Sequence, residues 1–433
     1  MTDLEYRPRM LRSFGAARGQ QWTQAAASWA IFAIALSIGQ PGVAEDLEPD
    51  WISVRHSGMG NASTATSTDS ESVFANPAGL TRIRNPRSRN GIHEVNIPRI
   101  SIVGSDKELK AIGGGFGQYE RNPLLDAFSK LNPKGNSEFR QEVRVFPSVV
   151  FGGKSAATWV LGAFGDNRTT IEHQAGNPNG TYLIQRDVTV GGAIGVSGSS
   201  RGGTFSYGLS LRPNARYFSS ENNVTIDPDN PPNYSTSFMA LTQTTGIGLD
   251  GGILFTAADF WLPTLGIAVR NIPTGCVADV MHPYAKSTTT ICGSVRTGSR
   301  APEHPRTMVD PTDVRLGFSM TPRFMLGPER LNLRLSAEAS HLAIPMGASS
   351  YGLPDVPLER MLSAGVELFF GHPMRSSGLA FRAGTADGGP TWGASIELWV
   401  LALEYSSFLR QTSFEDKTSL VVRDHMLGMS TKL

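Results

Sequence analysis

Apolar and polar side chains alternate with a period of two along much of the chain from residue 91 onward. In the clearest segment, 331–342, one face takes Leu331, Leu333, Leu335, Ala337 and Ala339, and the other takes Asn332, Arg334, Ser336, Glu338 and Ser340. Segments near 314–320, 362–368 and 427–433 follow the same rule. Because successive side chains of a β-strand point to opposite faces, these segments are predicted to be strands with one apolar and one polar face.

Two architectures fit such strands: a soluble sandwich that buries the apolar faces, and a transmembrane barrel that turns them to lipid. The candidate strands are 91–104, 143–153, 157–172, 181–199, 203–219, 236–256, 262–272, 312–324, 331–343, 359–371, 377–386, 390–398, 400–410 and 418–433. Their connections alternate between long and short along most of the chain, as outer-membrane barrels require and sandwiches do not. The sequence therefore predicts an all-β fold: an antiparallel transmembrane barrel of about 14 strands spanning residues 91–433.

Two observations bear on this predicted barrel. Residues 111–119 also have strand character, which would change the count by one hairpin. The last strand ends at Leu433, whereas many outer-membrane barrels end in an aromatic residue.

Composition narrows the class of protein further. The chain has 433 residues, with 39 Lys plus Arg against 38 Asp plus Glu, so its net charge of +1 gives no basic face for nucleic acid. A mean hydropathy of −0.16 argues against several apolar helical spans. The 47 glycines fit a protein rich in strands and turns.

The N-terminus has the organisation of an export signal. A basic lead precedes the apolar run 28–38, which is too short to span a bilayer, and small residues end at Ala44 before Glu45. Residues 1–44 are predicted to be a cleaved signal peptide, with an uncleaved anchor as the alternative. In an oxidising compartment Cys276 and Cys292 are candidates for a disulfide, the alternative being two unpaired thiols.

A segment before the first strand resembles a known family. Residues 58–65 (GMGNASTA) are followed by residues 72–80 (SVFANPAGL), and this order is similar to the N-terminal signature of FadL-like outer-membrane transport proteins. Residues 265–272 and 397–399 resemble the family more weakly. The resemblance implies a fourteen-stranded barrel whose N-terminal segment, here residues 45–90, folds inside it as a hatch.

The residue types of that segment fit a hatch, although an ordinary loop entering the first strand is the alternative. Glycines allow close backbone approach, and Pro77 biases Asn76 away from helix. The hatch residues singled out are Gly58, Gly60, Phe74, Asn76, Pro77 and Ala78.

Chemical motifs are misplaced for catalysis. The GxSxG pattern at 198–202 lies between strand-like runs, and the GxGxxG pattern at 246–251 lies within one, so neither leads into a helix. No enzyme activity, cofactor or metal is predicted, because the eight histidines are dispersed. Charged residues on the polar faces are candidates to line the lumen, either as a paired network around the hatch or to set the polarity of a passage: Arg315, Arg334, Glu338, Glu367, Arg382 and Glu404.

Three functions follow from this reading. The first, implied by the FadL-like resemblance, is transport of hydrophobic small molecules, fatty-acid-like or aromatic, past the hatch. The second is an assembly, secretion or conjugation partner without transport, because PorV-like and TraF-like relatives share the signature. The third is an outer-membrane enzyme. The expected location is the cell outer membrane, with membrane lipid, a hydrophobic ligand and a protein partner in a secretion or conjugation complex as candidate partners, and no nucleic acid.

Overall fold

The computed structural model describes residues 51–83, 91–105, 137–152, 157–173, 181–200, 204–225, 242–257, 261–277, 291–298, 308–322, 331–342, 358–372, 377–413 and 419–432. The predicted signal peptide, the strand candidate 111–119 and the terminal Leu433 lie outside these residues.

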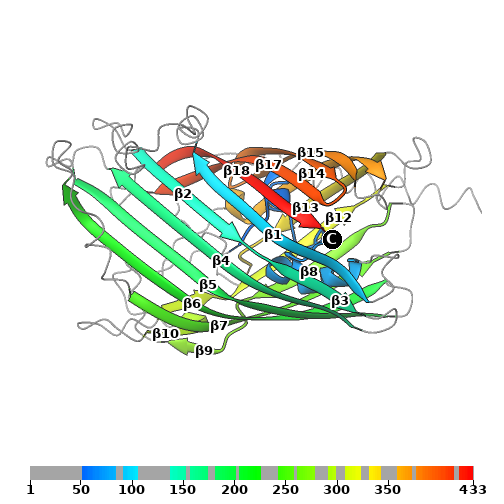
Figure 1. Cartoon of the computed structure of the whole chain (residues 1–433), viewed down its shortest axis with the longest axis horizontal. Helices are drawn as coiled ribbons and strands as arrows, with labels where there is room; N and C mark the ends of the chain where they lie inside the picture. Colours follow the sequence, from blue (N-terminus) through cyan, green and yellow to red (C-terminus); the bar gives the residue numbers. More distant parts are fainter. Residues whose placement is uncertain are drawn as a thin grey trace, which may run out of the picture.

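Antiparallel strands make up most of the described chain (Figure 1). The strands are β1 (Ile92–Ser105), β2 (Ser137–Val145), β3 (Ser148–Gly152), β4 (Thr158–His173), β5 (Thr181–Ser199), β6 (Phe205–Thr225), β7 (Thr242–Thr256), β8 (Thr264–Arg270), β9 (Gly275–Val277), β10 (Ile291–Gly298), β11 (Met308–Pro311), β12 (Asp313–Met320), β13 (Leu331–Ala339), β14 (Leu362–His372), β15 (Ser377–Ala386), β16 (Gly389–Leu398), β17 (Leu401–Ser413) and β18 (Ser419–Lys432). The helices are α2 (Val54–Gly58), α3 (Ser72–Ala75), the 3-10 helix η1 (Pro77–Arg82) and α7 (Leu358–Met361). None of the helices in the described residues is long and apolar enough to cross a membrane.

The described strands close into one barrel of fourteen wall positions. β2 and β3 share a position, since both pair with β1 and with β4, and β11 runs on into β12 at another. β10 extends the wall between β7 and β11, with β9 paired to it, and β1 pairs with β18 to close the sheet. The predicted antiparallel barrel of about 14 strands is confirmed.

The second wall position differs from the predicted strand 143–153. It begins at Ser137 and is interrupted at Phe146 and Pro147. Proline has no N–H to give to the sheet, so the ladder breaks there. The backbone N–H of Phe146 donates to the carbonyl of Arg99 on β1 at 2.8 Å, which keeps the break joined to its neighbour.

The sequence predicts one long connection, 273–311, between the candidate strands 262–272 and 312–324. This prediction was wrong in one respect, because the connection contains the strands β9, β10 and β11. These strands have three, eight and four residues, and such short pieces show little periodicity in the sequence. β10 pairs with the end of β7, where Arg296 lies opposite Gly246, and with β11 on its other side.

The two faces of the barrel wall have opposite polarity. Large apolar side chains point outward and are half exposed, as at Leu209 (54%), Leu265 (50%) and Phe381 (53%). Their chain neighbours point inward and are buried and polar, among them Ser210, Arg212, Thr264 and Arg382. A water-soluble protein arranges its strands in the opposite sense, whereas a barrel in lipid needs this one.

Residues 51–83, here called the plug segment, lie in the barrel interior. α2 contacts β15, β16, β17 and β18, while η1 contacts β4, β5, β6 and β7 on the other side. In Figure 1 this blue ribbon lies among the strands rather than outside them. The side chains of Val73, Ala78 and Leu80 are fully buried although they belong to no sheet. The plug segment therefore fills space that the wall encloses.

Candidate functional site

The candidate site is the interface between the plug segment and the inner face of the wall. Glu367 on β14 is one centre of it. Its carboxylate accepts from Arg55 of the plug segment at 2.9 and 2.7 Å, and from Arg382 on β15 at 3.0 Å. Arg334 on β13 adds a third guanidinium at 3.2 Å. Removing any one partner would leave buried charge uncompensated, so this group ties the plug segment to three neighbouring strands.

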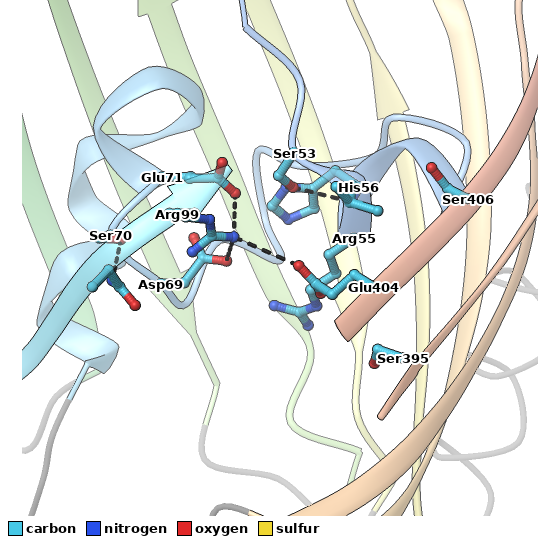
Figure 2. A network of polar contacts seen from close by, with 12 residues as sticks. Ser53, Arg55, His56, Asp69, Ser70, Glu71, Arg99, Ser395, Glu404 and Ser406 are labelled. Carbon is cyan, nitrogen blue, oxygen red and sulfur yellow. Dashed lines mark hydrogen bonds and ion pairs between the residues drawn. The ribbon is translucent and has the colours of Figure 1, made fainter. Parts of the chain in front are cut away.

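Arg99 on β1 is a second centre, drawn in Figure 2. It donates to Glu71 of the plug segment and lies 3.6 Å from Asp69, also in the plug segment. Glu404 on β17 lies 3.8 Å from Arg99 and 3.8 Å from Arg382, so it links this centre to the first. The linked network contains four arginines and four carboxylates, so their charges balance when all are ionised: Arg55, Arg99, Arg334, Arg382, Asp69, Glu71, Glu367 and Glu404.

Glu338 on β13 holds the backbone of the plug segment directly. One carboxylate oxygen accepts from the N–H groups of Ser63 and Thr64 at 2.6 and 2.7 Å, and the other lies 3.4 Å from Arg315. Hydrogen bonds to an ionised acceptor are the stronger class. The turn at residues 63–64 is thereby fixed against the wall.

Asn76 organises the chain around Pro77. Its side-chain N–H donates to the carbonyl of Thr64 at 2.8 Å, and its side-chain oxygen accepts from the N–H of Ala78 at 3.1 Å, which caps η1. Its backbone is extended, as expected before a proline, and Pro77 occupies the first turn where no N–H is needed. Asn76 is fully buried, so these bonds replace contacts with water.

Glycines on the wall let the plug segment approach closely. Among the described strands, nine carry a glycine whose missing Cβ would press on the plug segment: Gly195, Gly208, Gly252, Gly266, Gly317, Gly365, Gly384, Gly393 and Gly428. Gly60 of the plug segment has φ +67°, and a Cβ there would overlap the carbonyls of Ala364 and Thr385. A Cβ on Gly58 would lie 3.2 Å from the backbone of Gly393. At these glycine positions there is therefore no room for a larger side chain.

An aromatic cluster joins the plug segment to the wall at another point. Trp51 and Phe74 of the plug segment stack at a centroid distance of 4.6 Å. Phe146 and Phe164 on the wall meet Phe74 edge to face at 4.8 and 5.4 Å. Two of the four rings belong to each partner, so this apolar surface is shared and would be divided if the plug segment moved.

Burial sets the protonation of His56 in α2. Its Nδ1 lies 2.7 Å from the hydroxyl of Ser53, and within the described residues its Nε2 has no hydrogen-bond partner. Burial and then the neighbouring Arg55 charge lower the pKa of His56 from 6.5 to about 3. The docked plug segment thus holds a neutral imidazole.

The residues singled out from sequence occupy these places. All six charged candidates for the lumen point inward and lie in ion pairs. The six hatch residues lie at the interface or in its aromatic cluster. Cys276 and Cys292 stand directly opposite each other in the backbone register of β9 and β10, while their side chains lie outside the described set.

Sequence reasoning missed half of the charge network, namely Arg55, Asp69, Glu71 and Arg99. Arg99 carried a usable signal, since it shares the inward face of β1 with Val103. The three charges of the plug segment carried none, because that segment has no periodicity that would orient them. In the described residues no group of three or more His, Cys, Asp or Glu could hold a metal ion.

No protein-family profile matches the chain, and none of the curated proteins matches its sequence. Solved structures do match in fold. The TodX deltaS2S3 mutant, a monoaromatic hydrocarbon channel, is similar with a TM-score of 0.50 at 12% identity, covering 88% of this chain and 98% of that chain. The Ralstonia pickettii toluene transporter TbuX has a TM-score of 0.46 at 11% identity, covering 89% and 99%. A Pseudomonas aeruginosa FadL homologue has 0.44 at 12%, covering 87% and 97%. The FadL-like resemblance read from residues 58–80 thus has a structural counterpart: this chain has the barrel fold of the TodX channel.

Proposed function

We propose that this protein is an outer-membrane channel for small hydrophobic molecules, and that the plug segment acts as its hatch. The observation that carries the proposal is the aromatic cluster shared between plug segment and wall. When the plug segment leaves, Phe146 and Phe164 remain with Val150, Val160 and Ala193 as an apolar lining inside the barrel. These two rings would meet an aromatic ligand edge to face, as they meet Trp51 and Phe74 in the docked state.

The fold similarity supports the same ligand class. The matching TodX structure is of a monoaromatic hydrocarbon channel. An aromatic hydrocarbon has no charge to satisfy, so it would pass along the ring cluster and avoid the charge network. The outward apolar surface of the wall suits a place in the outer membrane.

The test is to lock the plug segment in place. The hydroxyl oxygens of Ser57 in α2 and Ser406 on β17 lie 2.6 Å apart. In a background where Cys276 and Cys292 are serine, Ser57→Cys with Ser406→Cys should form a disulfide that blocks uptake of toluene, and reductant should restore it. Ser57→Cys alone is the matched control and should transport in either condition. Uptake by the oxidised double variant at the rate of the control would refute a moving hatch.

A second function has an observation of its own. Close glycine contacts on nine strands and a balanced charge network hold the plug segment on all sides, which favours a permanent plug. A permanently filled barrel suits the assembly or secretion role that PorV-like and TraF-like resemblance suggests. In that case oxidation would not change toluene uptake by cells with the double variant. Cells with any of the variants would take up toluene no faster than cells without the protein.

A further inference from the structure

The outward face of β16, β17 and β18 carries a polar cluster within an apolar surface. Odd-numbered residues point outward on β17 and β18, since Leu403, Leu427 and Met429 are 43%, 44% and 41% exposed. Their even-numbered neighbours point inward to the plug segment and the lumen. The same outward rows hold Tyr405, Ser407, Arg423 and His425, which are cross-strand neighbours.

The side chains of this cluster touch one another across three strands. The phenol oxygen of Tyr405 lies 2.6 Å from Nδ1 of His425, and the two rings stack at 5.9 Å. Arg423 donates from Nη1 to the hydroxyl of Ser407 at 3.0 Å. Trp392 on β16 lies 4.9 Å from the Tyr405 ring and is 47% exposed. Ser407 is fully buried beneath them.

The charge of Arg423 has no acidic partner in the described part of the chain, where its hydrogen bond is to a hydroxyl. An arginine on the lipid-facing side of a barrel is costly at the membrane midplane and nearly neutral at the interface. A cation there is stabilised by an anion that arrives from the membrane itself.

The height of the cluster places it at such an interface. The hairpin of β15 and β16 turns at Asp387 and Gly388, and Trp392 follows a few residues later. Leu427 and Met429 continue the apolar surface toward the opposite end, where the chain terminates. Aromatic residues of membrane barrels gather where the apolar band meets the head groups. The cluster therefore lies toward the end of the barrel that is remote from the C-terminus, where Val421 is the next outward residue. The same end of β1, at Ser105, leads into the long connection before β2, and the longer connections of outer-membrane barrels lie on the cell exterior.

We propose that Arg423, beside the rings of Tyr405 and Trp392, binds the phosphorylated head group of an outer-leaflet lipid of the lipid A type. The guanidinium presents a planar set of donors that matches phosphate oxygens. His425 is 8% exposed and lies against the Tyr405 phenol, so it positions that ring beside Arg423. Trp392 covers the junction between sugar and acyl chains. The inference rests on the proposed outer-membrane location, and it is independent of transport.

The experiment uses the purified, folded full-length protein in detergent. Native mass spectrometry would measure retention of hexa-acylated bisphosphoryl lipid A, and of the same lipid with its phosphates removed. The variants are Arg423→Gln, Arg423→Lys, which keeps the charge without the planar fork, and the control Arg186→Gln. Arg186 shares the outward row of β5 with Val190 and Ile194, so the control removes the same charge elsewhere on the outer face.

The unaltered protein should prefer the phosphorylated lipid, and Arg423→Gln should weaken its retention by about tenfold. Arg423→Lys should fall between the two, and Arg186→Gln should match the unaltered protein. Equal retention by Arg423→Gln, an equal loss in Arg186→Gln, or no preference for phosphate would overturn the proposal. Displacement of the lipid by millimolar inorganic phosphate would also overturn the proposal, because it would indicate a site for a free anion. A changed oligomer mass of Arg423→Gln without loss of lipid would overturn it as well. Transport assays do not enter the result, so its failure is separate from failure of the channel proposal.

Discussion

At the scale of single residues, the plug segment is held by main-chain contacts as much as by side chains. Glu338 binds two of its N–H groups, and Gly60 leaves its backbone against the carbonyls of the wall. Contacts of this kind depend on the absence of side-chain atoms at the wall. Even a glycine-to-alanine substitution on the inward face, which adds one methyl group, should therefore displace the plug segment.

Gly252 and Gly251 on β7 offer a matched pair of neighbours. A Cβ on Gly252 would overlap the side chain of Asn76, while one on Gly251 would meet only Ile272 and Leu209 at 3.4 Å on the outer side. Overpacking a tight interface costs about 1–3 kcal/mol. Gly252→Ala should raise ion conductance of the barrel in planar bilayers, and Gly251→Ala should leave it unchanged. Equal conductance of the two variants would count against a tightly seated plug segment.

His56 makes seating of the plug segment dependent on pH. The pKa of His56 is about 3 when the plug segment is docked and 6.5 when it is free. The free energy of docking is therefore most favourable above pH 6.5 and becomes less favourable as the pH falls toward 3. At pH 5 the loss is about 2 kcal/mol. Hydrogen exchange of residues 53–59, corrected for its intrinsic pH dependence, should accelerate on going from pH 7 to pH 5.

His56→Gln serves as the reference, because burial raises the pKa of Glu71 in the plug segment to about 7, so that carboxyl group titrates over part of the same range. The variant should lose the extra acceleration at pH 5. If both proteins show the same difference between pH 7 and pH 5, His56 has no part in it.

At the scale of elements, strands and plug segment differ in how far sequence could predict them. β13 and β14 followed from strict alternation, since one face meets lipid and the other meets the lumen along their whole length. β9 and β10 were not predicted, because they are short and show little alternation in the sequence. The plug segment was placed through its family-like residues, yet its charged partners were not, because contacts such as Arg55 with Glu367 join residues over 300 positions apart.

The register of β9 and β10 sharpens the disulfide prediction. Cys276 and Cys292 are directly opposed, a position from which cross-strand disulfides form. A thiol-reactive reagent applied to the denatured, unreduced protein should label neither cysteine, and prior reduction should expose two labels. Full labelling without reductant would mean two unpaired thiols.

At the scale of the whole molecule, the exposed apolar belt and the polar interior predict how the protein behaves in detergent. A closed barrel keeps its backbone hydrogen bonds within the sheet, so it resists dodecyl sulfate until heated. The folded protein should migrate differently on gels with and without boiling and should fractionate with outer membranes. Recovery as a water-soluble protein with a single gel position would contradict the barrel in lipid.

The pairing of β1 with β18 has a consequence for the order of events during folding. This seam joins residues near the start of the described strands to the last strand, as where Asn96 meets Lys432, so it cannot form until the whole chain is present. The plug segment touches wall strands from β4 round to β18 and is fully enclosed once the seam has closed. Before closure it can reach the wall from the side, whereas afterwards it has to enter through an end of the barrel. Closure of the β1–β18 seam is therefore the folding step after which the barrel interior can no longer be filled from the side.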